Sequence, residues 1–131
     1  MRRTAFAIFS AGMWIGACEF LRNELLFKDY WVETFAELGL AFPSEPVNNA
    51  MWAVWSLLLA GCLAFLSGRL RFAGMVGVVW VLAFPMMWLV AANLGFLPLA
   101  LLPVAVPWSL VEVAGAALIV RGVMPEASGG R

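Results

Sequence analysis

Four long apolar stretches, separated by short polar segments, dominate the pattern of hydrophobic and polar positions along the chain. They cover about residues 4–21, 47–66, 73–94 and 97–120. Each is close to the ~20 residues that an α-helix needs to cross the ~30 Å hydrocarbon layer of a bilayer. Backbone groups in lipid must be paired within the spanning structure, and the alternation typical of a barrel strand is absent. The pattern therefore predicts an all-α membrane protein, an antiparallel bundle of four transmembrane helices.

The segment between the first two stretches has a helical pattern of its own. Apolar and acidic side chains recur there on two different faces: Phe27, Tyr30, Trp31, Phe35 and Leu38 on one, and Asp29, Glu33 and Glu37 on the other. Such a two-faced segment is typical of a short amphipathic helix lying at a membrane interface. We expect this helix at about residues 24–40.

Composition supports a membrane protein. Hydrophobic residues make up 64% of the 131 positions and charged residues 12%, against usual shares of roughly 45–50% and 25%. These values exclude a disordered chain, a nucleic-acid binder and a soluble enzyme, and they make the lipid bilayer the first expected partner. Residues 1–125 are expected to form one four-span domain, and the polar, glycine-containing residues 126–131 a flexible tail.

The basic residues indicate an orientation. Six of the eight fall on one side of the predicted spans (Arg2, Arg3, Arg69, Arg71, Arg121 and Arg131), and only Arg22 and Lys28 fall on the other. Loops rich in Arg and Lys stay in the cytoplasm. We therefore expect both termini in the cytoplasm and the protein in a bacterial inner membrane.

Prolines interrupt two of the spans. Pro85 lies in the middle of the third, and Pro103 and Pro107 lie in the outer half of the fourth. Each removes a backbone donor and frees a carbonyl one turn earlier, which predicts kinks. Kinked helices form binding sites in transporters, but prolines are also common in membrane helices without such a role. We favour the second interpretation.

Several kinds of chemistry are absent from the sequence. There is no histidine, and Cys18 and Cys62 belong to no CxxC motif. We therefore expect no metal site, no cofactor and no identifiable catalytic residue. The sequence leaves open whether the protein is an enzyme, with a non-enzyme favoured.

One alternative concerns processing of the first span. The basic start, the apolar run and Ile15–Cys18 resemble a bacterial lipoprotein signal that ends at a lipid-modified cysteine. The apolar run has no clear break at a cleavage site, so we favour an ordinary first span with a buried Cys18.

Glu112 is the main functional candidate. It lies near the middle of the fourth span, with no basic residue three or four positions away. A charged carboxylate at this depth costs at least ~2.5–3.5 kcal/mol on insertion scales, so it must face the bundle, find a partner on another helix, or be neutral. We predict a neutral, hydrogen-bonded acid that exchanges a proton or binds a ligand. The alternative is a buried acid that only ties helices together.

A second polar group is expected at the outer ends of the spans. Glu19, Arg22 and Asn23 share one helical face, and Asn48, Asn49 and Asn93 lie at the outer ends of the second and third spans. Together they predict a small outer cavity for a head group or small anion. The alternative is a local Glu19–Arg22 ion pair, with Arg22 turned outward to water and the asparagines bonding helix ends.

These features favour a small inner-membrane protein that binds or translocates a small ligand or protons. A chain of four helices is small for a transporter, so we expect a homo-oligomer. The alternative is an accessory or scaffold subunit of a larger membrane complex, whose polar residues are purely structural. An intramembrane enzyme with Glu19 as acid or base is the least favoured reading, because no nucleophile–base pair is evident.

Overall fold

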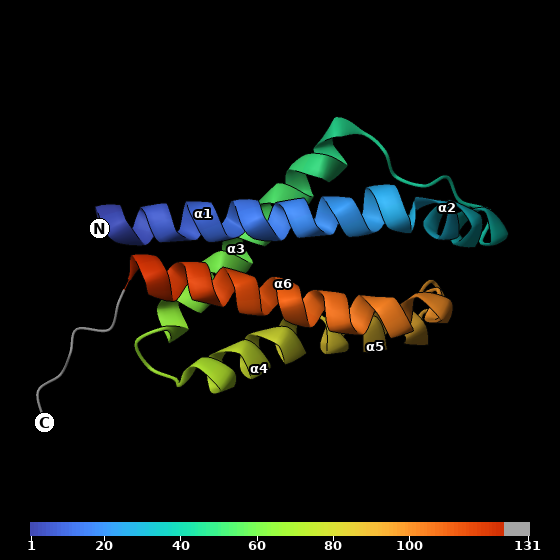
Figure 1. The fold of residues 1–131 in the computed structure, drawn as a ribbon. Helices are drawn as coiled ribbons and strands as arrows, with labels where there is room; N and C mark the ends of the chain where they lie inside the picture. The colour runs from blue at the N-terminus through green and yellow to red at the C-terminus, as the bar shows by residue number, and fades with distance from the viewer. Residues whose placement is uncertain (125–131) are drawn as a thin grey trace, which may run out of the picture.

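The computed structural model describes residues 1–124, which contain eight helical segments and the links between them. They are α1 (Arg2–Phe20), η1 (Leu21–Leu26), α2 (Lys28–Glu37), α3 (Pro46–Leu66), α4 (Phe72–Ala83), α5 (Pro85–Asn93), η2 (Leu99–Leu101) and α6 (Leu102–Val123) (Figure 1). No strand occurs within residues 1–124, so the all-helical fold class is confirmed for this range. The predicted tail at 126–131 lies outside the described residues.

Four helices, some of them joined end to end, are long and apolar enough to cross a membrane. They are Arg2–Leu26, Pro46–Leu66, Phe72–Asn93 and Leu99–Val123. The four predicted apolar helices are thus confirmed. The first reaches beyond its predicted end at residue 21, because the chain stays helical through η1 instead of entering a loop at Asn23.

The chain leaves α1 through a π-helical turn. In η1 the backbone winds more widely than in an α-helix, and the Phe27 amide donates to the Arg22 carbonyl at 3.0 Å. Such turns are rare and occur frequently at functional sites. The amphipathic helix follows as α2, over residues 28–37 rather than 24–40. No residue of α2 is buried, and the helix lies beyond the end of the bundle (Figure 1).

Helix α1 is central to the packing. It runs beside α6 in the opposite direction, and α3 crosses behind both (Figure 1); its most extensive contacts are with these two helices. Helices α1 and α3 approach closely at Gly12, where a Cβ would lie 2.7 Å from Leu57 Cδ2 and 3.4 Å from Leu57 Cα. Small residues of this kind let membrane helices approach closely.

Buried apolar side chains fill the half of the bundle that contains the N-terminus. Fully enclosed members come from four helices: Ala11, Ile15, Leu63, Met75, Val113, Ala117 and Val120. The buried polar side chain here is Ser67, whose hydroxyl donates to the Ala64 carbonyl at 2.9 Å. The hydroxyl of this residue is therefore satisfied by the last turn of α3.

The third span is broken where Pro85 was expected to kink it. Helix α4 ends at Ala83 and α5 begins at Pro85, with Phe84 between them at φ −111° and ψ −67°. Pro85 has no amide hydrogen to donate, and its ring clashes with the preceding turn. The break directs the fully buried Phe84 ring into the bundle, where it stacks edge-on against Trp55.

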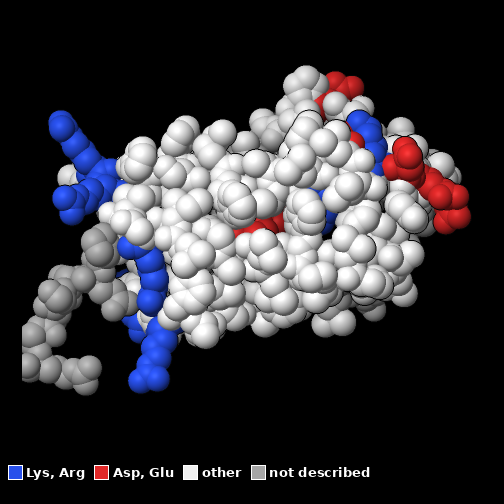
Figure 2. Space-filling model, viewed as in Figure 1, with Lys and Arg blue, Asp and Glu red and all other residues white. Residues whose placement is uncertain are grey.

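Charged side chains gather at the two ends of the molecule (Figure 2). The basic end combines the N-terminus, the α3–α4 link and the last turn of α6, and the acidic end contains α2. Between the ends, the visible face is uncharged except for acidic and basic atoms at the bottom of a hollow (Figure 2). That hollow leads to the buried cluster described next.

Candidate functional site

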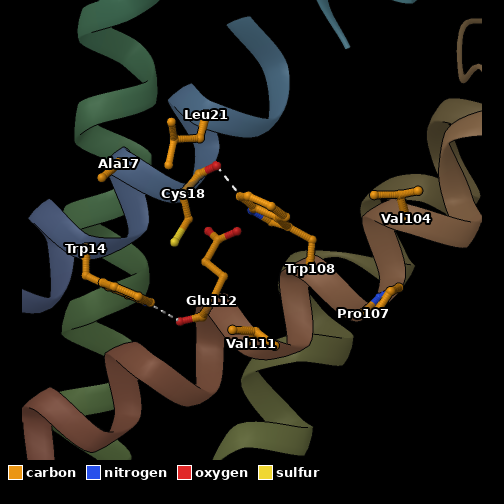
Figure 3. A pocket seen from close by; sticks show the side chains of 9 residues that line it. All are labelled: Trp14, Ala17, Cys18, Leu21, Val104, Pro107, Trp108, Val111 and Glu112. Atoms are coloured by element: carbon orange, nitrogen blue, oxygen red, sulfur yellow. Dashed lines mark hydrogen bonds between the residues drawn. The ribbon is translucent and has the colours of Figure 1, made fainter. Parts of the chain in front are cut away.

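Glu112 lies halfway along α6 and faces the interior. Its side chain is 0% exposed, and it is directed toward α1 between Cys18 and Trp108 (Figure 3). Both carboxylate oxygens are fully enclosed. The neutral, hydrogen-bonded state of Glu112 stays a prediction.

The nearest charged partner of Glu112 is Arg22, from η1. The distance between Arg22 Nη1 and Glu112 Oε2 is 3.7 Å. Arg22 also forms an ion pair with Glu19, and the side chains of both residues are 5% exposed. One guanidinium therefore lies between two carboxylates in a buried group that we call the Glu19–Arg22–Glu112 cluster.

Arg22 is not turned outward to water, as one alternative had it. Its guanidinium lies over the Phe84 ring, with 5.3 Å from Cζ to the ring centroid. Arg22 follows Glu19 by three residues, so the helix places both on one face, and Glu19 anchors the guanidinium inside the bundle. The sequence suggested the Glu19–Arg22 neighbourhood but treated Glu112 as a separate site.

The cluster continues toward the acidic end through Asn23. Asn23 Nδ2 donates to Glu19 Oε2 at 2.7 Å, and Trp31 Nε1 donates to Asn23 Oδ1 at 3.1 Å. Trp31 belongs to α2, so this chain of polar contacts runs from the middle of α6 to the helix at the end of the bundle. Sequence reasoning had assigned Trp31 only to the apolar face of that helix.

The other predicted polar residues are not part of the cluster. Asn49 and Asn93 are exposed, Asn48 is half-buried, and none of the three side chains has a hydrogen bond within residues 1–124. These three asparagines thus do not join the buried cluster, and the expected outer cavity stays a prediction. The buried site draws its charged groups from α1, η1 and α6 instead.

The charges of the cluster do not balance. Two carboxylates share one guanidinium, which leaves one surplus negative charge when both acids are ionised. An uncompensated charge in a water-excluded interior is unfavourable, because little solvent is present to screen it. Binding one proton or one monovalent cation would neutralise the group.

Two tryptophans fix α1 against α6 beside the cluster. Trp14 Nε1 donates to the Glu112 backbone carbonyl at 3.0 Å, and Trp108 Nε1 donates to the Cys18 carbonyl at 3.2 Å (Figure 3). The first contact needs glycine at position 115, where a Cβ would lie 2.6 Å from Trp14 Nε1. Sequence reasoning missed these bonds, because nothing in a single sequence pairs an indole with a distant carbonyl.

A groove of about 450 Å³ lies between α1 and α6 over the cluster. Trp14, Cys18 and Leu21 line its α1 side, and Pro107, Trp108 and Val111 line its α6 side, with Glu112 at its base (Figure 3). Leu21 and Val111 are exposed, so the groove opens on the apolar flank of the bundle. A molecule would reach it from the lipid phase.

Comparison with known proteins adds no family or fold assignment. No family model, curated protein or solved structure matches the chain. Within residues 1–124 no group of three or more His, Cys, Asp or Glu side chains is placed to hold a metal ion.

Proposed function

We propose that this chain is a membrane-embedded binding protein whose Glu19–Arg22–Glu112 cluster takes up and releases one proton. The observation that carries the proposal is the position of Glu112, which is fully enclosed and lies 3.7 Å from a guanidinium already paired with Glu19. One proton removes the surplus charge without requiring space in a closely packed interior.

Proton access to the cluster is proposed from the acidic end only. Asn23 and Trp31 extend the polar contacts in that direction. In the other direction Val113, Ala117 and Val120 lie on α6 below Glu112, and all three are fully buried among apolar neighbours. A single chain would therefore bind and release on one side, and translocation would need a homo-oligomer with a second path.

We place both termini in the cytoplasm of a bacterial inner membrane. The support is the distribution of charge, with the described arginines other than Arg22 at the basic end and the acidic α2 at the other. Basic residues are retained on the cytoplasmic side during insertion. The cluster would then exchange its proton with the outer face.

The test is an infrared difference spectrum of the purified protein between about pH 5 and about pH 9, the range that brackets physiological proton exchange. We expect a protonated-carboxyl band that is absent from Glu112→Gln. Glu24→Gln is the matched control, because Glu24 pairs with Lys28 at the surface at 2.6 Å and is partly exposed. It should keep the band.

A spectrum without any carboxyl band that depends on Glu112 would refute proton exchange. The alternative function, an accessory subunit with structural polar residues, would then be favoured. Native mass spectrometry of gently extracted protein separates the two further, because it reports a homo-oligomer in one case and a larger complex in the other.

A further inference from the structure

We infer that the α1–α6 groove binds a lipid-soluble organic cation, and that this cation competes with the proton of the Glu19–Arg22–Glu112 cluster. The inference rests on the proposed function, since it takes the surplus negative charge of that cluster as the common target. It adds the class of ligand and its route of entry. The ligand has an apolar body and a delocalised or shielded single positive charge, as in a quaternary ammonium or phosphonium ion.

The shape and position of the groove indicate an apolar body. Its volume is about 450 Å³, and its walls are aliphatic and aromatic side chains that face the lipid phase. Pockets for small molecules in proteins are commonly of this size and character. A hydrophilic ligand would have to give up its hydration to enter, whereas a lipid-soluble one is already concentrated in the bilayer.

The charge of the ligand follows from Glu112. Its carboxylate is 0% exposed, shares its guanidinium partner with Glu19, and belongs to a side chain at the base of the groove. A cation in the groove neutralises the surplus charge, while an anion adds to it. The difference in electrostatic energy between a bound cation and a bound anion is large, because the ligand lies a few ångströms from the carboxylate in a medium of low dielectric.

The ligand needs no hydrogen-bond donor. Trp14 Nε1 and Trp108 Nε1 already donate to backbone carbonyls, and the enclosed Glu112 carboxylate lies between Cys18 and Trp108. An ammonium group with free N–H bonds would find no partner at the surface of the groove. A shielded cation is instead attracted through space by the carboxylate and by the indole rings, the strongest cation–π partners among side chains.

Competition with the proton follows from the number of charges. One positive charge balances the cluster, so a bound cation favours loss of the proton and a bound proton weakens cation binding. The charged and titratable groups that face Glu112 are Glu19, Arg22 and the Cys18 thiol, all on α1 and η1. Helices α4 and α5 have no ionisable side chain, and α3 has only the exposed Cys62.

The experiment measures binding of tetraphenylphosphonium to the purified full chain, with tetraphenylborate, an anion of nearly the same shape, as the matched ligand. We expect the phosphonium to bind and the borate not to bind. Phosphonium binding should weaken from about pH 9 to about pH 5, as protons occupy the cluster. Calorimetry in two buffers of different ionisation enthalpy should show release of a proton on binding at the lower pH. These measurements use the unaltered protein and need no variant.

Variants then locate the site. Glu112→Gln should weaken phosphonium binding by about tenfold or more, and Trp108→Leu by roughly tenfold. Glu24→Gln should leave it unchanged.

Two results would overturn the inference, because each would show that the groove binds apolar bodies regardless of charge. The first is equal affinity for phosphonium and borate. The second is an affinity for phosphonium that changes neither with pH nor in Glu112→Gln. Absence of phosphonium binding together with a Glu112-dependent infrared band would overturn the inference and leave the proposed function standing. Absence of the band as well would remove both.

Discussion

Arg22 and Glu112, which lie near opposite ends of the sequence, meet inside the bundle with 3.7 Å between Nη1 and Oε2. The contact joins the π-helical turn after α1 to the middle of α6. It makes Arg22 the shared counter-ion of two buried carboxylates, because the same guanidinium pairs with Glu19. The fold and the candidate site therefore depend on the same residue.

Arg22→Met should destabilise the protein strongly. The substitution leaves Glu19 and Glu112 buried without a counter-charge, and breaking a buried ion pair by removing one partner costs about 3–5 kcal/mol. The free energy of unfolding in detergent measures the effect. Adding Glu112→Gln to Arg22→Met should restore part of the loss, because one of the two unpaired carboxylates is then gone.

The matched control is Lys28→Met. Lys28 pairs with Glu24 at the surface at 2.6 Å, and exposed ion pairs contribute only about 0–1 kcal/mol. Similar losses for Arg22→Met and Lys28→Met would contradict the central role of Arg22.

Gly115→Ala should separate α1 from α6. The new Cβ would lie 2.6 Å from Trp14 Nε1, so the indole would have to leave the Glu112 carbonyl. Overpacking of this kind costs typically about 1–3 kcal/mol. Thermal unfolding followed by tryptophan fluorescence measures the change. Gly61→Ala is the control, since a Cβ there meets no atom within 4 Å; a comparable loss at both positions would argue against the close contact.

Phe84→Ala should be destabilising and should also disturb Arg22. Phe84 is 0% exposed and lies under the guanidinium, and removing a buried phenylalanine ring costs about 3–5 kcal/mol. Phe9→Ala is the matched control, because Phe9 is 59% exposed on the flank of α1. Urea or detergent unfolding of the two variants gives the comparison, and an equal effect would refute the assignment of Phe84 to the core.

The proposed orientation predicts a labelling pattern. In a Cys62→Ala background, Ala36→Cys in α2 should react with an impermeant maleimide added to intact cells. Gly68→Cys, in the α3–α4 link at the basic end, should react only after the membrane is opened. Both positions are exposed in the fold, and the native Cys18 is buried. The reverse pattern would place the basic end outside.

Much of the fold could be predicted from the pattern of apolar positions. A helix pairs every backbone N–H and C=O group within its own segment, as a lipid environment requires. Four apolar runs of suitable length are therefore enough to indicate four helices. The boundary of the first span was less accurate, because the π-helical extension to Leu26 takes up residues that look like loop. The break at Phe84, in contrast, falls where Pro85 had predicted a kink.

The sequence by itself determined which residues are unfavourable to bury. The free-energy cost of placing Glu112 or Glu19 in an apolar segment is a property of the side chain and its position along the segment. It also placed Glu19, Arg22 and Asn23 on one face, since that follows from helical spacing. Only the tertiary structure decided that Arg22 turns inward to Glu112 and that a groove lies over the cluster. It also decided that Asn48, Asn49 and Asn93 lie outside the cluster. The physical reason is that these relations depend on how helices distant in sequence cross and rotate, and close packing between α1, α3 and α6 sets that geometry.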